Sequence, residues 1–134
     1  MPSDPIDAVR TPCKLDDWVL TPTYRPGDFD SHQVDAPFLF RHDGRYRMLY
    51  VAFDGAGYRP GLAASDDLIH WQRDGLAHDR GPAGSLTEFN VSINCVLRDT
   101  ELYGDGDATL VDGKLLAVWH GYPERGQEQG RGYT

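Results

Sequence analysis

Five Asp-Gly pairs constrain this chain more than any other feature of its sequence. They begin at Asp43, Asp54, Asp74, Asp105 and Asp112. Asp-Gly between apolar segments is typical of tight β-hairpins, because both residues tolerate the positive φ angles that such turns require. With 15 glycines and 9 prolines in 134 residues, the apolar segments are short, and no extended amphipathic helical pattern is present. The sequence therefore predicts an all-β chain.

The segments between the first turns predict a meander of four strands at 37–41, 45–53, 58–65 and 69–73, preceded by a short strand at 18–21. We expect Pro37 to be tolerated at a strand start and Pro60 to interrupt the third strand. In the second strand, alternation predicts that Met48 and Tyr50 share one face of the sheet and that Leu49 lies on the other.

Two parts of the sequence repeat one pattern, which begins with Asp35-Ala36 in the first part and with Asp107-Ala108 in the second. Each pair precedes a short apolar strand, an Asp-Gly turn, a basic residue and a longer apolar strand. In the second part, these strands are expected at 107–111 and 114–122, after a candidate strand at 91–97. Four-stranded units repeated at this scale are typical of β-propellers.

The repeat predicts one incomplete β-propeller domain over residues 1–134. Its first blade is expected at about 35–73 and the start of its second at about 105–122. Because an incomplete propeller exposes strand edges, we also expect self-association of this chain.

Charge and cysteine content narrow the classes of partner. The net charge of −8 disfavours nucleic acid, which is bound through Lys and Arg, and it disfavours an anionic membrane surface. The N-terminal segment lacks the basic and apolar regions of a secretory signal, so we expect a cytoplasmic protein. Cys13 and Cys95 are too few and too far apart for a zinc site, and two separate thiols are favoured over a disulfide.

Residues 28–75 resemble the first blade of the five-bladed β-propeller glycosidases. The shared pattern is an acid near a proline, an apolar strand, Asp-Gly, a Tyr-rich strand and then the segment GLAASDDLIHW at 61–71. This group contains the invertase-like enzymes (glycoside hydrolase family 32), the arabinanases and xylosidases (family 43) and related phosphorylases (family 130). The resemblance is weaker over 104–122. Within the segment, the turn at 65–71 is interpreted as structural.

The resemblance implies roles for carboxylates, since glycoside hydrolysis needs a general acid and a base or nucleophile. It implies that Asp35 is the base or nucleophile and that Asp107 stabilises the transition state, both facing one channel. In the family the acid directly precedes the proline, whereas Ala36 intervenes here. A shift of one residue turns a strand side chain to the other face, so Asp30 is the alternative catalytic residue.

The general acid, a glutamate of the third blade, has no clear counterpart, and Glu128 resembles it only faintly. The isolated chain is therefore expected to be inactive. His32 and His120 are candidates for contacts with substrate, although a core role is the alternative for both. No cofactor or metal is expected, and the segment 104–107 lacks the rest of a calcium-binding loop.

The function that the resemblance implies is hydrolysis of a glycosidic bond in an oligosaccharide or polysaccharide. A non-catalytic carbohydrate-binding module is the alternative from another class. A further alternative is a glycoside phosphorylase, in which phosphate replaces water and a basic pocket is needed.

Overall fold

The computed structural model describes residues 15–124, which contain eight β-strands and no helix. Strands β1 (Gln33–His42), β2 (Arg45–Phe53), β3 (Tyr58–Ser65) and β4 (Gln72–Leu76) form an antiparallel sheet in chain order. Strand β5 (Asn90–Val96) pairs with β8 (Ala117–Tyr122), and β6 (Leu110–Val111) pairs with β7 (Lys114–Leu115). The chain is thus all-β, as predicted, and this stretch has no helix able to cross a membrane.

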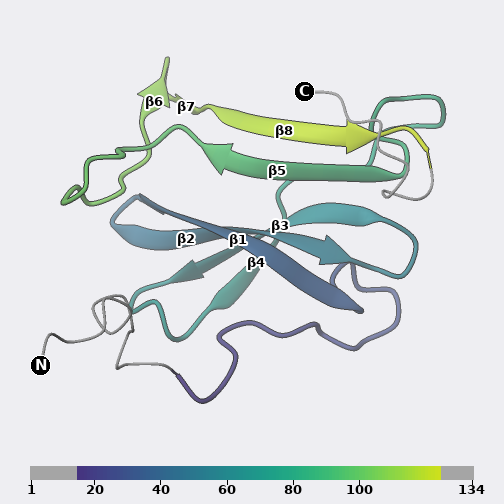
Figure 1. Ribbon diagram of the computed structural model, residues 1–134, viewed down its shortest axis with the longest axis horizontal. Coiled ribbons are helices and arrows are strands. Elements are labelled where there is room, and N and C mark those ends of the chain that lie inside the picture. Colours follow the sequence, from purple (N-terminus) through teal and green to yellow (C-terminus); the bar gives the residue numbers. More distant parts are fainter. Residues whose placement is uncertain (1–14, 125–134) are drawn as a thin grey trace, which may run out of the picture.

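The two larger sheets lie one over the other. Figure 1 shows the β5–β8 ribbon above the four-stranded sheet, with β5 as the nearer strand, and β5 contacts β1, β2 and β3. We call residues 33–76 the first unit and residues 90–122 the second unit. A complete four-stranded sheet followed by part of another on its face is a partial β-propeller, comprising one blade and part of the next.

Two of the five Asp-Gly pairs form the tight hairpins that the sequence predicts. Asp43 and Gly44 have φ angles of 52° and 74°, and Asp112 and Gly113 have φ angles of 51° and 73°. Both central residues are thus left-handed, as hairpin turns that match the strand twist require. Another pair behaves differently, because Gly75 lies inside β4 with a φ of 104°.

The first unit departs from the predicted strands in three places. The expected strand at 18–21 is absent, and the fourth strand is β4 at 72–76 rather than 69–73. Pro60 does not interrupt β3, since its carbonyl accepts a hydrogen bond from the Ala77 amide and the pairing with β2 continues through it. The neighbouring Gly61 is required sterically, because any side chain there would collide with the Tyr50 ring.

The second unit departs further from the prediction. The strand expected at 114–122 is divided into β7 and β8, and β8 pairs with β5 rather than with 107–111. The reason is that Asp107 and Ala108 have other partners: they form bridges to Arg41 at the end of β1 and to Arg98 beyond β5. The segment 106–109 therefore joins the two units instead of pairing with β8.

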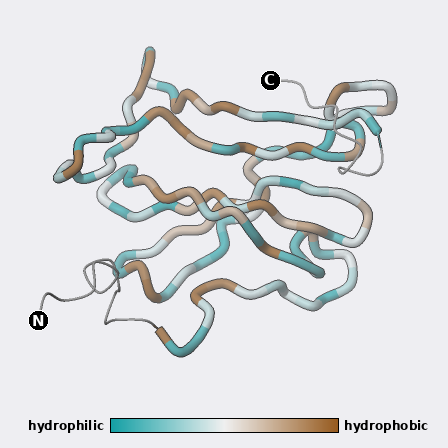
Figure 2. The backbone as a smooth tube through the Cα atoms, viewed as in Figure 1, coloured by the Kyte–Doolittle hydropathy of each residue, from teal (hydrophilic) through white to brown (hydrophobic). Residues whose placement is uncertain are grey.

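Two apolar clusters hold the sheets in place, one on each face of the first unit. Met48, Tyr50, Ala52 and Ala63 form the first cluster, which Leu20 and Phe29 of the N-terminal segment cover. Phe40, Leu49 and Val96 form the second cluster, between the two units. The faces predicted for Met48, Tyr50 and Leu49 are confirmed. Figure 2 shows apolar residues gathered where the first sheet crosses beneath β5.

Polar bonds complete the joint between the units at two separate places. The Tyr58 amide donates to Asn90 Oδ1 at 2.9 Å, and Asn90 is buried. Near the other end of β1, the Arg41 amide donates to the Gly106 carbonyl, and the Ala108 amide donates to the Arg41 carbonyl. The second unit is thus attached to the first near both ends of β5.

The turn after β3 is stabilised by its own polar groups, in agreement with the structural interpretation. Asp67 accepts hydrogen bonds from the His70 ring, from the backbone amides of His70 and Ile69, and from Ser65 Oγ. These bonds, with the His70 ring first among them, hold the pKa of the Asp67 carboxyl well below its usual value.

Candidate functional site

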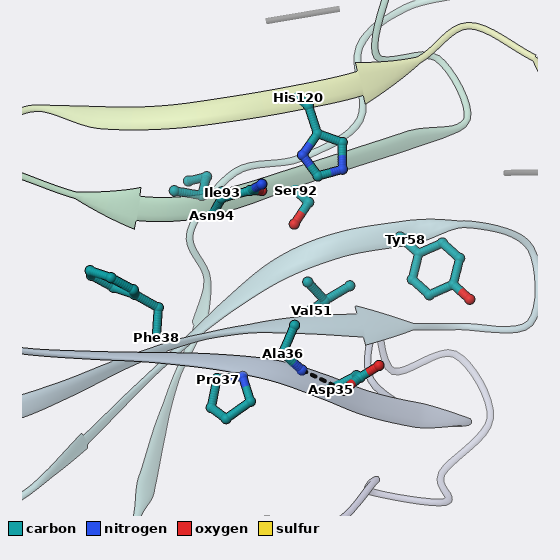
Figure 3. A pocket seen from close by; sticks show the side chains of 10 residues that line it. All are labelled: Asp35, Ala36, Pro37, Phe38, Val51, Tyr58, Ser92, Ile93, Asn94 and His120. Atoms are coloured by element: carbon teal, nitrogen blue, oxygen red, sulfur yellow. Dashed lines mark hydrogen bonds between the residues drawn. The ribbon is translucent and has the colours of Figure 1, made fainter. Parts of the chain in front are cut away.

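A cavity of about 470 Å³ lies between the two units. Four segments line it: β1 near its bulge, the β2–β3 hairpin, the middle of β5 and β8. The lining residues are Asp35, Ala36, Pro37, Phe38, Val51, Tyr58, Ser92, Ile93, Asn94 and His120. Figure 3 shows Ser92 and His120 directed from the second unit toward Val51 and Tyr58 of the first. We call this space the inter-unit cavity.

Asp35 reaches the inter-unit cavity because β1 contains a β-bulge. Asp35 pairs with Val51 and Phe38 pairs with Leu49, so β1 has one residue more than β2 over this interval. In a regular strand, residues three apart point to opposite faces. The bulge removes that difference, and Asp35 lies on the same face as Val51, since directly paired residues share a face. Ala36 therefore does not turn Asp35 away from the cavity.

The conformation of the bulge is specific. Ala36 has a φ of 46°, which is uncommon for any residue other than glycine, asparagine or aspartate. The Ala36 amide donates to Asp35 Oδ1 at 2.6 Å, a bond drawn as a dashed line in Figure 3. One carboxylate oxygen of Asp35 is thereby held by its own backbone. The side chain is exposed and its second oxygen has no partner within 15–124.

The second unit provides a second bulge on the opposite wall. Ile93 pairs with Trp119 and Cys95 pairs with Val118, which leaves Asn94 as the extra residue. Asn94 and the buried Ser92 both line the inter-unit cavity. Bulges commonly re-aim side chains next to functional sites. Two bulges on two different sheets that open on one cavity mark this place as the candidate site.

The polar side chains of the cavity are not used to hold the fold. In the described part of the chain, Ser92 Oγ, the Asn94 amide, the Tyr58 hydroxyl and the His120 ring nitrogens make no side-chain hydrogen bond with protein groups. The Tyr58 ring packs on Phe53, with ring centroids 4.8 Å apart, and this contact orients it. Donors and acceptors are thus free to bind a polar ligand.

A second cavity, of about 360 Å³, lies on the other side of β1 and is mainly apolar. Trp18 and Trp71 flank it, and Leu39 and Met48 form part of its floor. Asp35 and Pro37 line both cavities, so β1 separates them. This second cavity lies on the face of the first unit that β5 does not cover.

Asp30, the alternative catalytic residue, is buried beneath the N-terminal segment. Its side chain is 1% exposed, and its Oδ2 accepts hydrogen bonds from Arg73 Nε at 2.7 Å and from the Tyr50 hydroxyl at 3.3 Å. Burial, with the Asp30 carboxylate second, raises the pKa of the Tyr50 hydroxyl well above its usual value. Arg73 also donates to the Thr21 carbonyl. Asp30 lines neither cavity, which favours a structural role.

Asp107 lies elsewhere in the structure. Its side chain is 65% exposed and its Oδ1 is 3.7 Å from Arg41 Nε. Arg41 is near the C-terminal end of β1, six residues beyond Asp35, or roughly 20 Å along an extended strand. The structure therefore does not bring Asp107 and Asp35 together, because the segment 106–109 bridges to the far end of β1.

The two predicted histidines also differ. His120 lines the inter-unit cavity and its ring packs edge-on against Tyr122. His32 lines neither cavity; its Nδ1 is 2.9 Å from Ser31 Oγ, and its ring packs edge-on against Phe53. Ser92 and Asn94 were not predicted. Two small polar residues alternating with apolar ones in NVSINCV were the available signal.

Other candidate chemistry is limited. Within residues 15–124, no group of three or more His, Cys, Asp or Glu side chains could hold a metal ion. Cys95 is a free thiol, while Cys13 and Glu128 lie outside the described residues.

Beside the cavity, Asp54 accepts hydrogen bonds from Arg59 at 2.5 Å and from Arg80 at 2.7 Å. Burial alone would raise the pKa of the Asp54 carboxyl, but two backbone amides and both guanidinium groups hold it below its usual value.

Comparison with known proteins identifies the fold. A solved structure named as a complex of BT0996 and RGII is similar with a TM-score of 0.66 and 24% identity, over 78% of this chain and 30% of that one. Another, named "Glycoside hydrolase", is similar with a TM-score of 0.61 and 23% identity, over 73% of this chain and 29% of that one. The chain thus spans less than a third of either and shares their fold. No protein-family model and no curated protein matches it.

Proposed function

We propose that this chain forms part of the substrate channel of a five-bladed propeller glycoside hydrolase, similar to families 43 and 32, with Asp35 as the base or nucleophile. One observation carries the proposal: a β-bulge places the Asp35 carboxylate at the wall of a cavity between two propeller units. Sugar hydroxyls need several hydrogen-bonding groups, and Tyr58, Ser92, Asn94 and His120 offer them in the same cavity.

Hydrolysis requires two carboxyl groups on either side of the scissile bond. Within residues 15–124, Asp35 is the one carboxylate that lines the inter-unit cavity. The second group must then come from outside this stretch. We therefore expect the 134-residue chain to bind carbohydrate without cleaving it.

The two alternatives make different demands on the site. A phosphorylase needs basic side chains for phosphate, and none of the ten lining residues within the described part of the chain is Lys or Arg. A carbohydrate-binding module needs only the cavity, and the single carboxylate is the observation that favours it. Hydrolase and module differ in whether Asp35 takes part in bond cleavage.

The first experiment measures binding. The ¹⁵N-labelled chain is titrated with methyl glycosides of common pentoses and hexoses, and amide shifts near Ala36, Asn94 and His120 are followed. We expect saturable shifts with at least one glycoside. Asp35→Asn should weaken that binding about tenfold, as loss of a charged hydrogen-bond acceptor implies. Asp107→Asn should leave binding unchanged, because Asp107 does not line the cavity.

A second measurement tests cleavage. With aryl glycosides, we expect no turnover by the 134-residue chain. Turnover that disappears in Asp35→Asn would mean that this chain already contains both carboxyl groups. Absence of saturable binding to every glycoside tested would sink the proposed function itself.

A further inference from the structure

Two β-bulges face each other across the inter-unit cavity, one carrying Asp35 and the other carrying Asn94. Each inserts one residue into its strand without a partner on the neighbouring strand. A bulge disrupts local pairing and is retained where it aims a side chain. The pair therefore indicates that Asn94, like Asp35, is directed at a ligand.

The charges around this cavity are unequal. Asp35 carries the one carboxylate of the lining residues, and the opposite wall at Ser92 and Asn94 is neutral. Nearby guanidinium groups are already engaged: Arg59 and Arg80 pair with Asp54. Arg98 lies over the Phe38 ring, 5.0 Å from its centroid, and does not line the cavity. An anionic ligand would meet the Asp35 carboxylate without a cation among the lining residues to offset it.

We propose that Asn94 is a specificity-determining residue that fits the cavity to uncharged sugars and, with Asp35, excludes uronic acids and sugar phosphates. This inference rests on the proposed function and names the substrate class of the same site. The Asn94 side chain offers both a carbonyl acceptor and an amide donor, which together match a sugar hydroxyl. A carboxylate or phosphate at that position would satisfy only the donor and would add repulsion from Asp35.

The test uses matched probes and the full 134-residue chain. The probes are methyl glucoside with methyl glucuronide, and methyl galactoside with methyl galacturonide; in each pair a hydroxymethyl group is replaced by a carboxylate. Dissociation constants are measured by NMR titration at about pH 8, where histidines of ordinary pKa are uncharged. We expect the neutral member of a pair to bind at least tenfold more tightly than its uronide, roughly the effect of one unscreened charge contact near a surface.

Substitutions at Asn94 test its assigned role. Asn94→Lys should reverse the preference, so that the uronide binds more tightly, whereas Asn94→Asp should widen the preference for the neutral sugar. Gln72→Lys is the matched control, since Gln72 is exposed on β4 and lines neither cavity; it should keep the original ratio. The amide spectrum of each variant verifies its fold.

The outcomes separate this inference from the proposed function. A uronide that binds the unmodified chain as tightly as the neutral sugar overturns the inference and leaves carbohydrate binding intact. An unchanged ratio in both Asn94 variants overturns the role of Asn94. Failure of all four probes and of the whole glycoside panel overturns the proposed function, and this inference with it.

Discussion

The pair Asp-Ala begins each of the two units predicted from the sequence, yet its two copies have different surroundings. Asp35-Ala36 forms a bulge inside a long strand and faces a cavity. Asp107-Ala108 lies in a short segment that bridges the end of β1 and the residues after β5. The difference shows that a repeated local pattern does not fix the position of a side chain. The strands that pair with it do.

The two units also differ in how they are stabilised. The first unit is covered on both faces, and it contains the buried pair of Asp30 and Arg73. The second unit depends on the first for its apolar contacts, and its carboxylate at Asp107 forms only a distant, exposed pair. Substitutions in the two units should therefore have unequal effects.

The largest effect is expected at the buried ion pair. Asp30→Ala should lower the free energy of unfolding by about 3 kcal/mol, because it leaves Arg73 and the Tyr50 hydroxyl without their acceptor. Asp107→Ala should change it by less than about 0.5 kcal/mol, as is usual for exposed pairs. Urea denaturation monitored by tryptophan fluorescence measures both. If Asp30→Ala were as stable as Asp107→Ala, the structural role of Asp30 would be wrong and its catalytic role would regain support.

A smaller effect compares the two Asp-Gly hairpins. Gly44 and Gly113 both have positive φ and open space where a side chain would begin. Gly44→Ala should cost about 1 kcal/mol of global stability through backbone strain alone. Gly113→Ala should cost less than half as much, because β6 and β7 have two residues each and can open locally. Equal costs in urea denaturation would mean that the β6–β7 hairpin is as integral to the fold as the β1–β2 hairpin.

The smallest effect is a difference in sign. Ala36→Gly should raise the free energy of unfolding by about 0.5–1 kcal/mol, since glycine adopts the left-handed φ of 46° without strain. Ala108→Gly should lower it by a similar amount, because Ala108 is not left-handed and glycine only adds freedom to the unfolded chain. Thermal unfolding of the two variants side by side provides the measurement. Destabilisation by both would be inconsistent with the bulge geometry at Ala36.

Local signals predicted much of the first unit. The turn at Asp43-Gly44, the alternation of Met48 and Leu49 and the meander depend on neighbours close in the sequence, so a single chain reveals them. The continuation of β3 through Pro60 was missed because it depends on where β4 ends, which is a tertiary property.

The candidate site was predicted only in part. Asp35 was identified through a family resemblance, but whether Ala36 reverses its direction depends on the register with β2, which the sequence does not specify. Asn94 was missed for the same reason, since its bulge exists only relative to β8. The placement of Asp107 was not predictable from the repeat, because hydrogen bonds to Arg41, distant in sequence, determine it.

The joint between the units has a thermodynamic consequence for any ligand. The bond from Tyr58 to Asn90 and those from Arg41 to Gly106 and Ala108 hold the two walls of the cavity at separate points. A space fastened in this way exists before the ligand arrives, so binding orders few backbone groups and loses little conformational entropy. Selection should then act mainly through fit and charge, and fast association with small structural change is expected on titration.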